Sequence, residues 1–200
     1  MIFSREYVLQ HGYEKYIQSL FCKSMFSNIS QFSNIDDYLP ILNAVILTDL
    51  VVMILLIFGW IQSTQVGKWY EKYNLAAVIA DVLIIFIGII LARFLYPLIF
   101  TKFSIWYFVL LAVVIQVIHD ICFYVLFSAI PRGSNYMIDT FKDYAKEKGV
   151  KAIVADSFMM ICACLFASFF KGLGKNSNII LLIFLVYMVP YLVYTRFPRS

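Results

Sequence analysis

The sequence predicts an all-α fold, a polytopic transmembrane helix bundle with interfacial amphipathic helices beside it. Of its 200 residues, 62% are hydrophobic and 14% are charged, whereas soluble domains are typically about 45–50% apolar and about 25% charged. A soluble fold of this length could not bury so much apolar surface in its own core. The apolar residues also form continuous runs without the alternation of barrel strands, so helices are expected to cross a lipid bilayer.

Five apolar runs are long enough, or nearly long enough, to be spans, since a helix needs about 20 mostly apolar residues to cross ~30 Å of hydrocarbon. Together they form a predicted bundle over residues 40–200. The spans are expected at residues 40–62, 74–99, 105–130, 152–170 and 178–196. The last contains Pro190, which should kink that helix or end its regular part. An alternative with four spans places the fourth or the fifth run at the membrane interface.

Two further segments are predicted to be amphipathic helices that lie on the membrane or on the bundle. In the N-terminal segment, residues 1–39, apolar side chains recur at helical spacing between Ile17 and Met25. Residues 134–149 form a basic amphipathic helix that Ser134 or Asn135 can cap and Gly149 can stop. The basic side chains in and beside that helix are expected to contact anionic headgroups or an acidic partner. They are Arg132, Lys142, Lys146, Lys148 and Lys151.

The distribution of Lys and Arg between the loops predicts the orientation. More of them lie on the side that holds loops 63–73 and 131–151 and the C-terminus than on the other side. Cytoplasmic loops carry an excess of Lys and Arg, so we expect an external N-terminus and a cytoplasmic C-terminus. Arg93, inside the second span, is expected to snorkel to the external interface near Lys102.

Each of the first four predicted spans contains one aspartate, and these are Asp49, Asp81, Asp120 and Asp156. At a rise of about 1.5 Å per residue, all four lie in the same half of the bilayer or near its centre. An acid that faces lipid costs at least ~2.5–3.5 kcal/mol. The four are therefore expected to face inward, neutral or paired with polar groups.

The third span adds further polar side chains to this pattern. Gln116, Asp120 and Tyr124 recur at i, i+4 and i+8, with His119 beside them, so their polar atoms are expected to share one inward stripe. His119 and Asp120 are not expected to bond each other, because neighbours on a helix diverge by about 100°. In the second span, Gly88 and Ala92 predict a close helix contact.

This intramembrane polar cluster (Asp49, Asp81, Gln116, His119, Asp120 and Asp156) has two interpretations. In the structural one, hydrogen bonds between its members determine which helices meet. In the functional one, the acids carry protons or cations and His119 titrates as a relay. We favour the first, because a pathway should connect both faces and these acids gather toward one.

Enzyme chemistry has little support in the sequence. No Gly-rich phosphate loop and no His-x-x-x-His pair occurs, so no catalytic residue, metal or cofactor is predicted. A metal site made from His119 with aspartates of other helices is the remaining alternative. No basic patch interleaved with aromatic residues points to nucleic acid.

The run IHDICFYVLFSAIPRGSNYMIDTFKDYAKEKGVKAIVADSFMM, followed by VPYLVY, resembles uncharacterised multi-pass membrane proteins of nucleocytoplasmic large DNA viruses that infect algae and protists. The resemblance covers about residues 70–195. It implies a place in the virion's internal membrane or a host-derived membrane, beneath an icosahedral shell. The expected function is that of a non-enzymatic minor capsid or membrane protein that links membrane to capsid. The expected partners are the lipid bilayer, other viral capsid or membrane proteins, and a second copy of the chain. The alternative is a proton or cation channel or transporter.

Overall fold

The computed structural model describes residues 26–61 and 63–195. Within these residues five helices are long and apolar enough to cross a membrane, which confirms the predicted all-α bundle. They are α2 (Tyr38–Ile57), α4 (Leu75–Ile99), α5 (Ile105–Ala129), α7 (Val150–Lys171) and α8 (Lys175–Val193). A short 3-10 helix, η1 (Ile35–Asp37), precedes α2. The helix predicted between Ile17 and Met25 lies outside the described residues.

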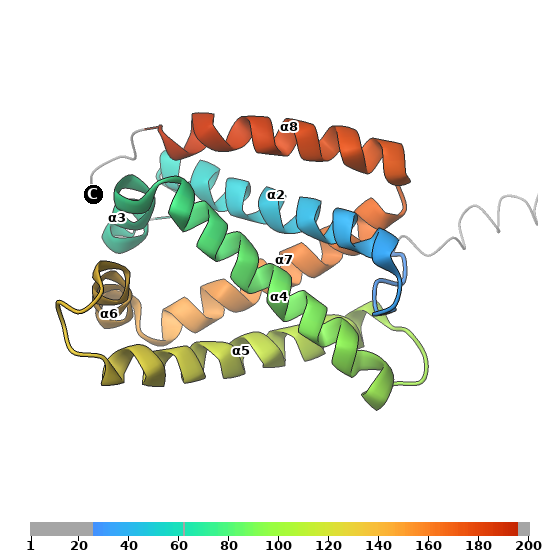
Figure 1. Cartoon of the computed structure of the whole chain (residues 1–200), viewed down its shortest axis with the longest axis horizontal. Coiled ribbons are helices and arrows are strands. Elements are labelled where there is room, and N and C mark those ends of the chain that lie inside the picture. The colour runs from blue at the N-terminus through green and yellow to red at the C-terminus, as the bar shows by residue number, and fades with distance from the viewer. Residues whose placement is uncertain (1–25, 62, 196–200) are drawn as a thin grey trace, which may run out of the picture.

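Four of the long helices close into a ring. Helix α2 packs against α7 and α4, and α5 packs against the same two helices from the other side. Helix α8 covers the outer side of α2 (Figure 1), so α2 is the most enclosed of the five. Helices α5 and α8 instead expose rows of large apolar side chains, as expected of surfaces that lipid covers.

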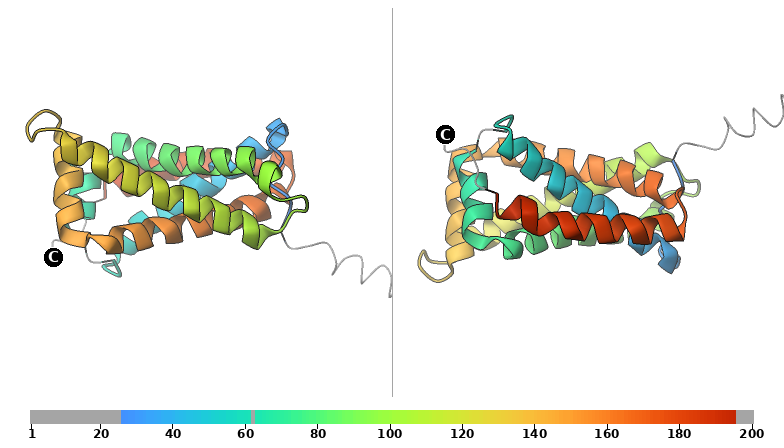
Figure 2. Two further views of the ribbon diagram at one scale, coloured as in Figure 1. Left: turned by 90° about the horizontal axis from the view of Figure 1, so that it is seen from below. Right: turned by 90° about the horizontal axis from the view of Figure 1, so that it is seen from above.

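Two shorter helices, α3 (Thr64–Tyr73) and α6 (Tyr136–Lys148), lie next to each other across one end of the ring (Figures 1 and 2). We call this pair the cap, and the end that it covers the cap end. The Tyr73 hydroxyl lies 2.6 Å from the carbonyl of Tyr136, to which it donates, and Trp69 packs on Phe141 with ring centroids 4.8 Å apart. Glu147 of α6 accepts hydrogen bonds from residues at the start of α3.

Local capping residues explain where the cap helices begin and end. Asn135 accepts hydrogen bonds from the backbone N–H groups of Met137 and Ile138, so α6 begins directly after it, and Gly149 (φ +53°) follows its last residue. The prediction from sequence missed α3. Its signal is present, because Ser63 caps the helix through the N–H of Val66 and apolar side chains recur along it at helical spacing.

Exposed aromatic side chains surround both ends of the bundle. Trp60, Tyr136 and Tyr194 lie at the cap end, and Trp106 and Tyr107 lie at the opposite end, each of them more than half exposed. Trp and Tyr are enriched where a membrane protein meets the headgroups on either side. Their distribution therefore supports a bilayer position in which the cap lies at one surface.

Gly88 sets how closely α4 approaches the helices that face it. A Cβ built on Gly88 lies 2.8 Å from Cε of Met160 on α7 and 3.8 Å from Oε1 of Gln116 on α5. We expect Gly88→Leu to lower the free energy of unfolding in detergent by about 1–3 kcal/mol, because an overpacked interface must spread. Gly88→Ala should cost less, since the end of Met160 is flexible. The control is Ala76→Leu at an exposed position of the same helix, and equal losses at both positions would contradict the close approach.

Candidate functional site

The four aspartates come together at the cap end of the ring, one from each of its helices. Counted from the helix termini at that end, they lie ~9–14 Å deep at the usual helical rise. Asp49 on α2 is fully buried, and Asp81 on α4, Asp120 on α5 and Asp156 on α7 are partly buried. The acids therefore lie together under the cap.

Helix α3 supplies hydrogen-bond donors to two of these acids. The Tyr70 hydroxyl donates to Oδ1 of Asp49 at 2.7 Å, and the Trp69 indole N–H donates to Oδ2 of Asp81 at 2.9 Å. Burial, together with the charges of Asp49 and Asp81, raises the pKa of Tyr70 well above its usual range, so the phenol stays a donor. The sequence analysis missed both residues. The signal that could have found them is the apolar face of α3, on which Val66, Trp69, Tyr70 and Tyr73 recur at helical spacing.

Helix α6 brings a second phenol to the acids. Burial raises the pKa of Tyr144 above its usual range, and the nearby carboxylates of Asp156 and Asp81 raise it further, with smaller effects of Glu147 and Asp120. Tyr144 thus also stays protonated in the physiological range. Each helix of the cap therefore places one protonated tyrosine beside the acids of the ring.

The polar side chains of α5 form a local network. Gln116 donates to Oδ1 of Asp120 at 2.7 Å, and Nδ1 of His119 lies 3.2 Å from the same oxygen. The expectation that His119 and Asp120 diverge too far to bond is wrong, because both side chains turn toward one another. Tyr124 is 56% exposed, so the inward stripe ends at Asp120 and the expected inward position of Tyr124 is also wrong.

Two carboxylate oxygens of the cluster lack a donor. Oδ2 of Asp49 and Oδ2 of Asp120 are buried and accept no hydrogen bond from any described residue. A buried polar atom left in this state costs about 1–3 kcal/mol. The cluster thus contains two buried acceptor atoms that the described residues leave unsatisfied.

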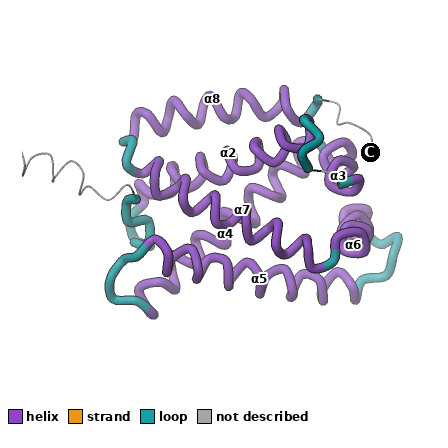
Figure 3. Tube along the Cα trace, turned by 180° about the vertical axis from the view of Figure 1, so that it is seen from behind, coloured by secondary structure: helices purple, strands orange, loops and turns teal. Residues whose placement is uncertain are grey.

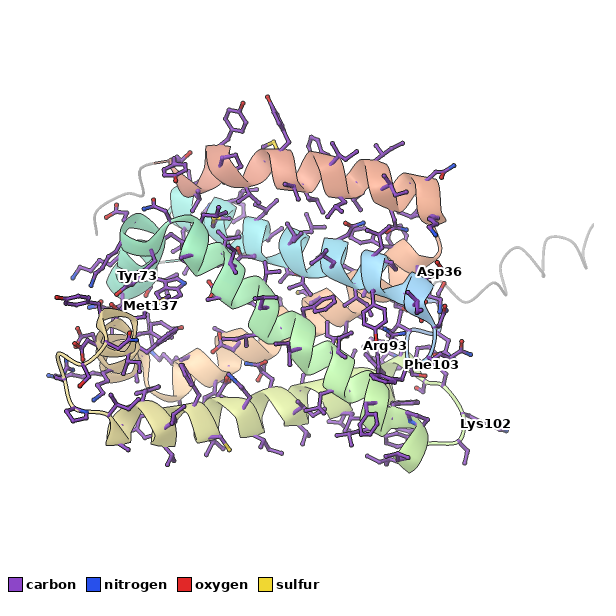
Figure 4. All side chains as sticks on the ribbon, viewed as in Figure 1. Asp36, Tyr73, Arg93, Lys102, Phe103 and Met137 are labelled. Atoms are coloured by element: carbon purple, nitrogen blue, oxygen red, sulfur yellow. The ribbon has the colours of Figure 1, made fainter. Side chains whose placement is uncertain are left out.

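Arg93 forms a second polar site, at the end opposite the cap (Figure 4). Its guanidinium lies 3.2 Å from Oδ2 of Asp37, donates to the carbonyls of Asn34 and Gln31, and stacks on the Tyr38 ring. Arg93 is 0% exposed, so the prediction that it snorkels to the interface is wrong. The reason is that the chain before α2 folds over this end of α4 and brings a carboxylate to it.

Lys171, at the end of α7, completes this site. Its ammonium lies 2.6 Å from Oδ1 of Asp37 and also donates to the carbonyl of Asn28. Ser168, nearly one turn earlier, donates to the carbonyl of Ser27 at 2.6 Å, and the N–H of Ser27 donates back to the carbonyl of Ser168 at 3.2 Å. These bonds fasten the segment before α2 to α7.

The interior between the two polar sites is apolar. The side chains that fill this part of the ring are each at most 7% exposed and include Val45, Ile85, Ile89, Ala112, Met160, Ala163 and Cys164. Asn43 bonds Asn178 between α2 and α8, outside the ring, and the Thr48 hydroxyl bonds a carbonyl of its own helix. No chain of buried polar side chains therefore joins the two sites within the described residues.

The basic residues predicted to contact headgroups or a partner lie in and around α6. Arg132 pairs with Asp143 at 2.9 Å, Lys148 pairs with Glu147 at 3.2 Å, and Lys142 donates to the carbonyl of Ile130. The other two, Lys146 and Lys151, are exposed. These five residues thus form part of the cap surface or lie close to it.

The fold and the two sites define a multi-pass helical membrane protein with a polar cluster closed under a two-helix cap. In the described part of the chain, no three His, Cys, Asp or Glu side chains lie close enough to share a metal ion. Comparison with models of known protein families, with curated proteins and with solved structures finds no match to this chain.

Proposed function

We propose that the chain is a non-enzymatic structural membrane protein whose cap holds a protein partner at the membrane surface. The setting proposed from the sequence resemblance is a virion inner membrane, where the chain links the membrane to the capsid. The observation that carries the proposal is the apolar packing between the polar cluster and the Arg93 site, which leaves no continuous polar path across the described part of the bundle. A rigid scaffold needs no such path, and a transporter does.

The hydrogen bonds of the polar cluster support a structural role. The bonds from Tyr70 to Asp49 and from Trp69 to Asp81 join the cap to two helices of the ring. Such bonds average well under ~1–2 kcal/mol each in membrane proteins, yet they determine which elements meet. The acids thereby fix the position of the cap, which is the part of the chain that we propose binds the partner.

Crosslinking tests where the partner binds. A photoreactive residue in place of Glu71, exposed on α3, is expected to crosslink a capsid or membrane protein in assembled particles, because α3 belongs to the proposed binding surface. The matched control replaces Thr101, which is exposed at the opposite end. Recovery of the same crosslinks from both positions, or of none from position 71 in particles that contain the chain, would contradict the proposal.

Ion flux tests the absence of transport. Vesicles that contain the purified chain are expected to carry no more proton or cation current than empty vesicles, because apolar side chains separate the two polar sites. The measurement is a pH-sensitive dye inside the vesicles, read after an imposed pH or potassium gradient. The proposed structural role would be rejected by a current that depends on pH or on the cation and that is abolished by Asp120→Asn.

A proton or cation translocator is the second candidate. The observation in its favour is that Oδ2 of Asp49 and Oδ2 of Asp120 are buried without a donor among the described residues, as expected of groups that exchange protons. This function requires a second conformation in which the apolar layer opens. In that case Asp49→Asn and Asp120→Asn should each reduce the flux at least tenfold, whereas Asp36→Asn, an exposed acid at the opposite end, should leave it unchanged.

A further inference from the structure

An amphipathic cleft lies between α5 and the cap helix α6. Tyr124, Phe127 and Ser128 line it from α5, and Lys142, Ala145 and Lys146 line it from α6. Figure 3 shows α6 lying across the end of α5, after the loop that joins the two helices. Ser128 is the penultimate residue of α5, so the cleft lies where the span ends, at the depth of the headgroups.

From this cleft we infer a binding site for an anionic phospholipid, with the lipid phosphate between Lys142 and Lys146. One side of the site belongs to α6, a helix of the cap, but binding of a lipid there does not depend on the partner that we propose binds the cap. Basic pockets at the ends of membrane helices are suited to anionic headgroups.

The contacts of Lys142 and Lys146 leave donors free. Lys142 donates to the carbonyl of Ile130, which holds its side chain at the mouth of the cleft. An ammonium group has three N–H donors, so the others can point to a phosphate. Lys146 is exposed, and its ammonium group can turn toward the cleft. The site therefore offers one ammonium held in position and one that can move onto the ligand.

The acids of α6 are engaged elsewhere and do not neutralise these lysines. Asp143 lies 2.9 Å from Arg132, and Asp139 accepts the N–H of Gly133 at 2.9 Å. Glu147 binds the start of α3 and Lys148. A net positive charge therefore remains at the cleft, complementary to a lipid with an anionic headgroup.

The apolar half of the site continues along α5. Ile121, Tyr124 and Val125 are each more than half exposed on the side of α5 that faces away from the ring. An acyl chain bound below the phosphate can lie along these side chains. This apolar surface favours a lipid over free phosphate, because free phosphate has no acyl chain that could contact it.

The test measures lipid preference at the cleft itself. Tyr124→Trp places a fluorophore at its mouth, and the full chain is reconstituted in phosphatidylcholine vesicles that contain brominated phosphatidylglycerol or brominated phosphatidylcholine as quencher. Because the chain already contains three Trp residues, the signal is the quenching of the Tyr124→Trp chain minus the quenching of the chain that keeps Tyr124. We expect stronger quenching by phosphatidylglycerol, and a fall in that preference of about fivefold for Lys146→Gln, the effect of about 1 kcal/mol per lysine near a charged headgroup. Lys142→Gln/Lys146→Gln should reduce the preference further.

The matched control removes the same charge at the same end of the bundle. Lys68→Gln/Lys72→Gln on α3 should leave the preference unchanged. An equal loss in both double variants would mean a general surface charge effect and would overturn the site. No preference in the chain that carries Tyr124→Trp alone would also overturn it. Displacement of brominated phosphatidylglycerol by millimolar inorganic phosphate would overturn the assignment to a lipid. Circular dichroism of Lys146→Gln, whose side chain is exposed, checks that the fold persists.

Discussion

Asp37→Ala is expected to lower the free energy of unfolding in detergent by about 3–5 kcal/mol, the usual cost of removing one partner of a buried ion pair. The substitution leaves the Arg93 guanidinium, which is 0% exposed, without a countercharge. Lys171 also loses its partner, but its side chain is 22% exposed and can reach solvent. The measurement is equilibrium unfolding in mixed micelles, followed by circular dichroism.

Two further variants separate this effect from general damage. Lys175→Gln removes an exposed ion pair with Asp36 at 3.4 Å. We expect it to lower the free energy of unfolding by about 0–1 kcal/mol. Asp37→Leu/Arg93→Met replaces the buried pair with apolar side chains and should recover most of the lost stability, because no uncompensated charge remains. A loss in Asp37→Ala no larger than in Lys175→Gln would show that the pair does not hold this end of the bundle together.

Tyr70→Phe is expected to lower the free energy of unfolding in detergent by about 1–3 kcal/mol, because it leaves a buried polar group without its partner. The substitution keeps the ring in place and removes the donor to Oδ1 of Asp49, whose Oδ2 already lacks one among the described residues. Unfolding in mixed micelles again measures the loss. The matched control, Tyr187→Phe, removes an exposed hydroxyl that accepts from Tyr191, and should change stability by less than about 0.5 kcal/mol. Equal effects of the two substitutions would mean that the cap is not held by this bond.

The same tyrosine gives the unfolding curve a pH dependence. The pKa of Tyr70 in the fold lies above its ordinary value of 10.0, so the folded state disfavours the phenolate. The stability that comes from the neutral phenol is therefore complete below about pH 10 and is lost as the pH rises further. The native chain should lose stability above that pH more steeply than Tyr70→Phe does.

Local features of the sequence are sufficient to predict the helices that form the bundle. Continuous apolar runs of spanning length predicted five long helices, because a chain in hydrocarbon must satisfy its backbone hydrogen bonds within each segment. The aspartates at similar depths, such as Asp81 and Asp156, follow from the fixed rise of a helix. The close helix contact at Gly88 and the ends of α6 at Asn135 and Gly149 also follow from local sequence patterns.

The side-chain pairings had no such local signal. Arg93 pairs with Asp37, which lies 56 residues earlier in the chain and before the predicted bundle. Trp69 and Tyr70 reach the acids because α3 turns back across the end of the ring. The bond between His119 and Asp120 depends on the rotamers of the two side chains, which the spacing of residues on a helix does not specify.

The sequence by itself thus determined that the chain is a helical membrane bundle whose four intramembrane aspartates gather toward one end. Hydropathy and helical periodicity are properties of short segments, and the bilayer acts on them directly. The tertiary structure decided which groups neutralise those charges and what closes the cap end. Those pairings depend on the order of helices around the ring and on where the chain reverses, and contacts between distant segments set both.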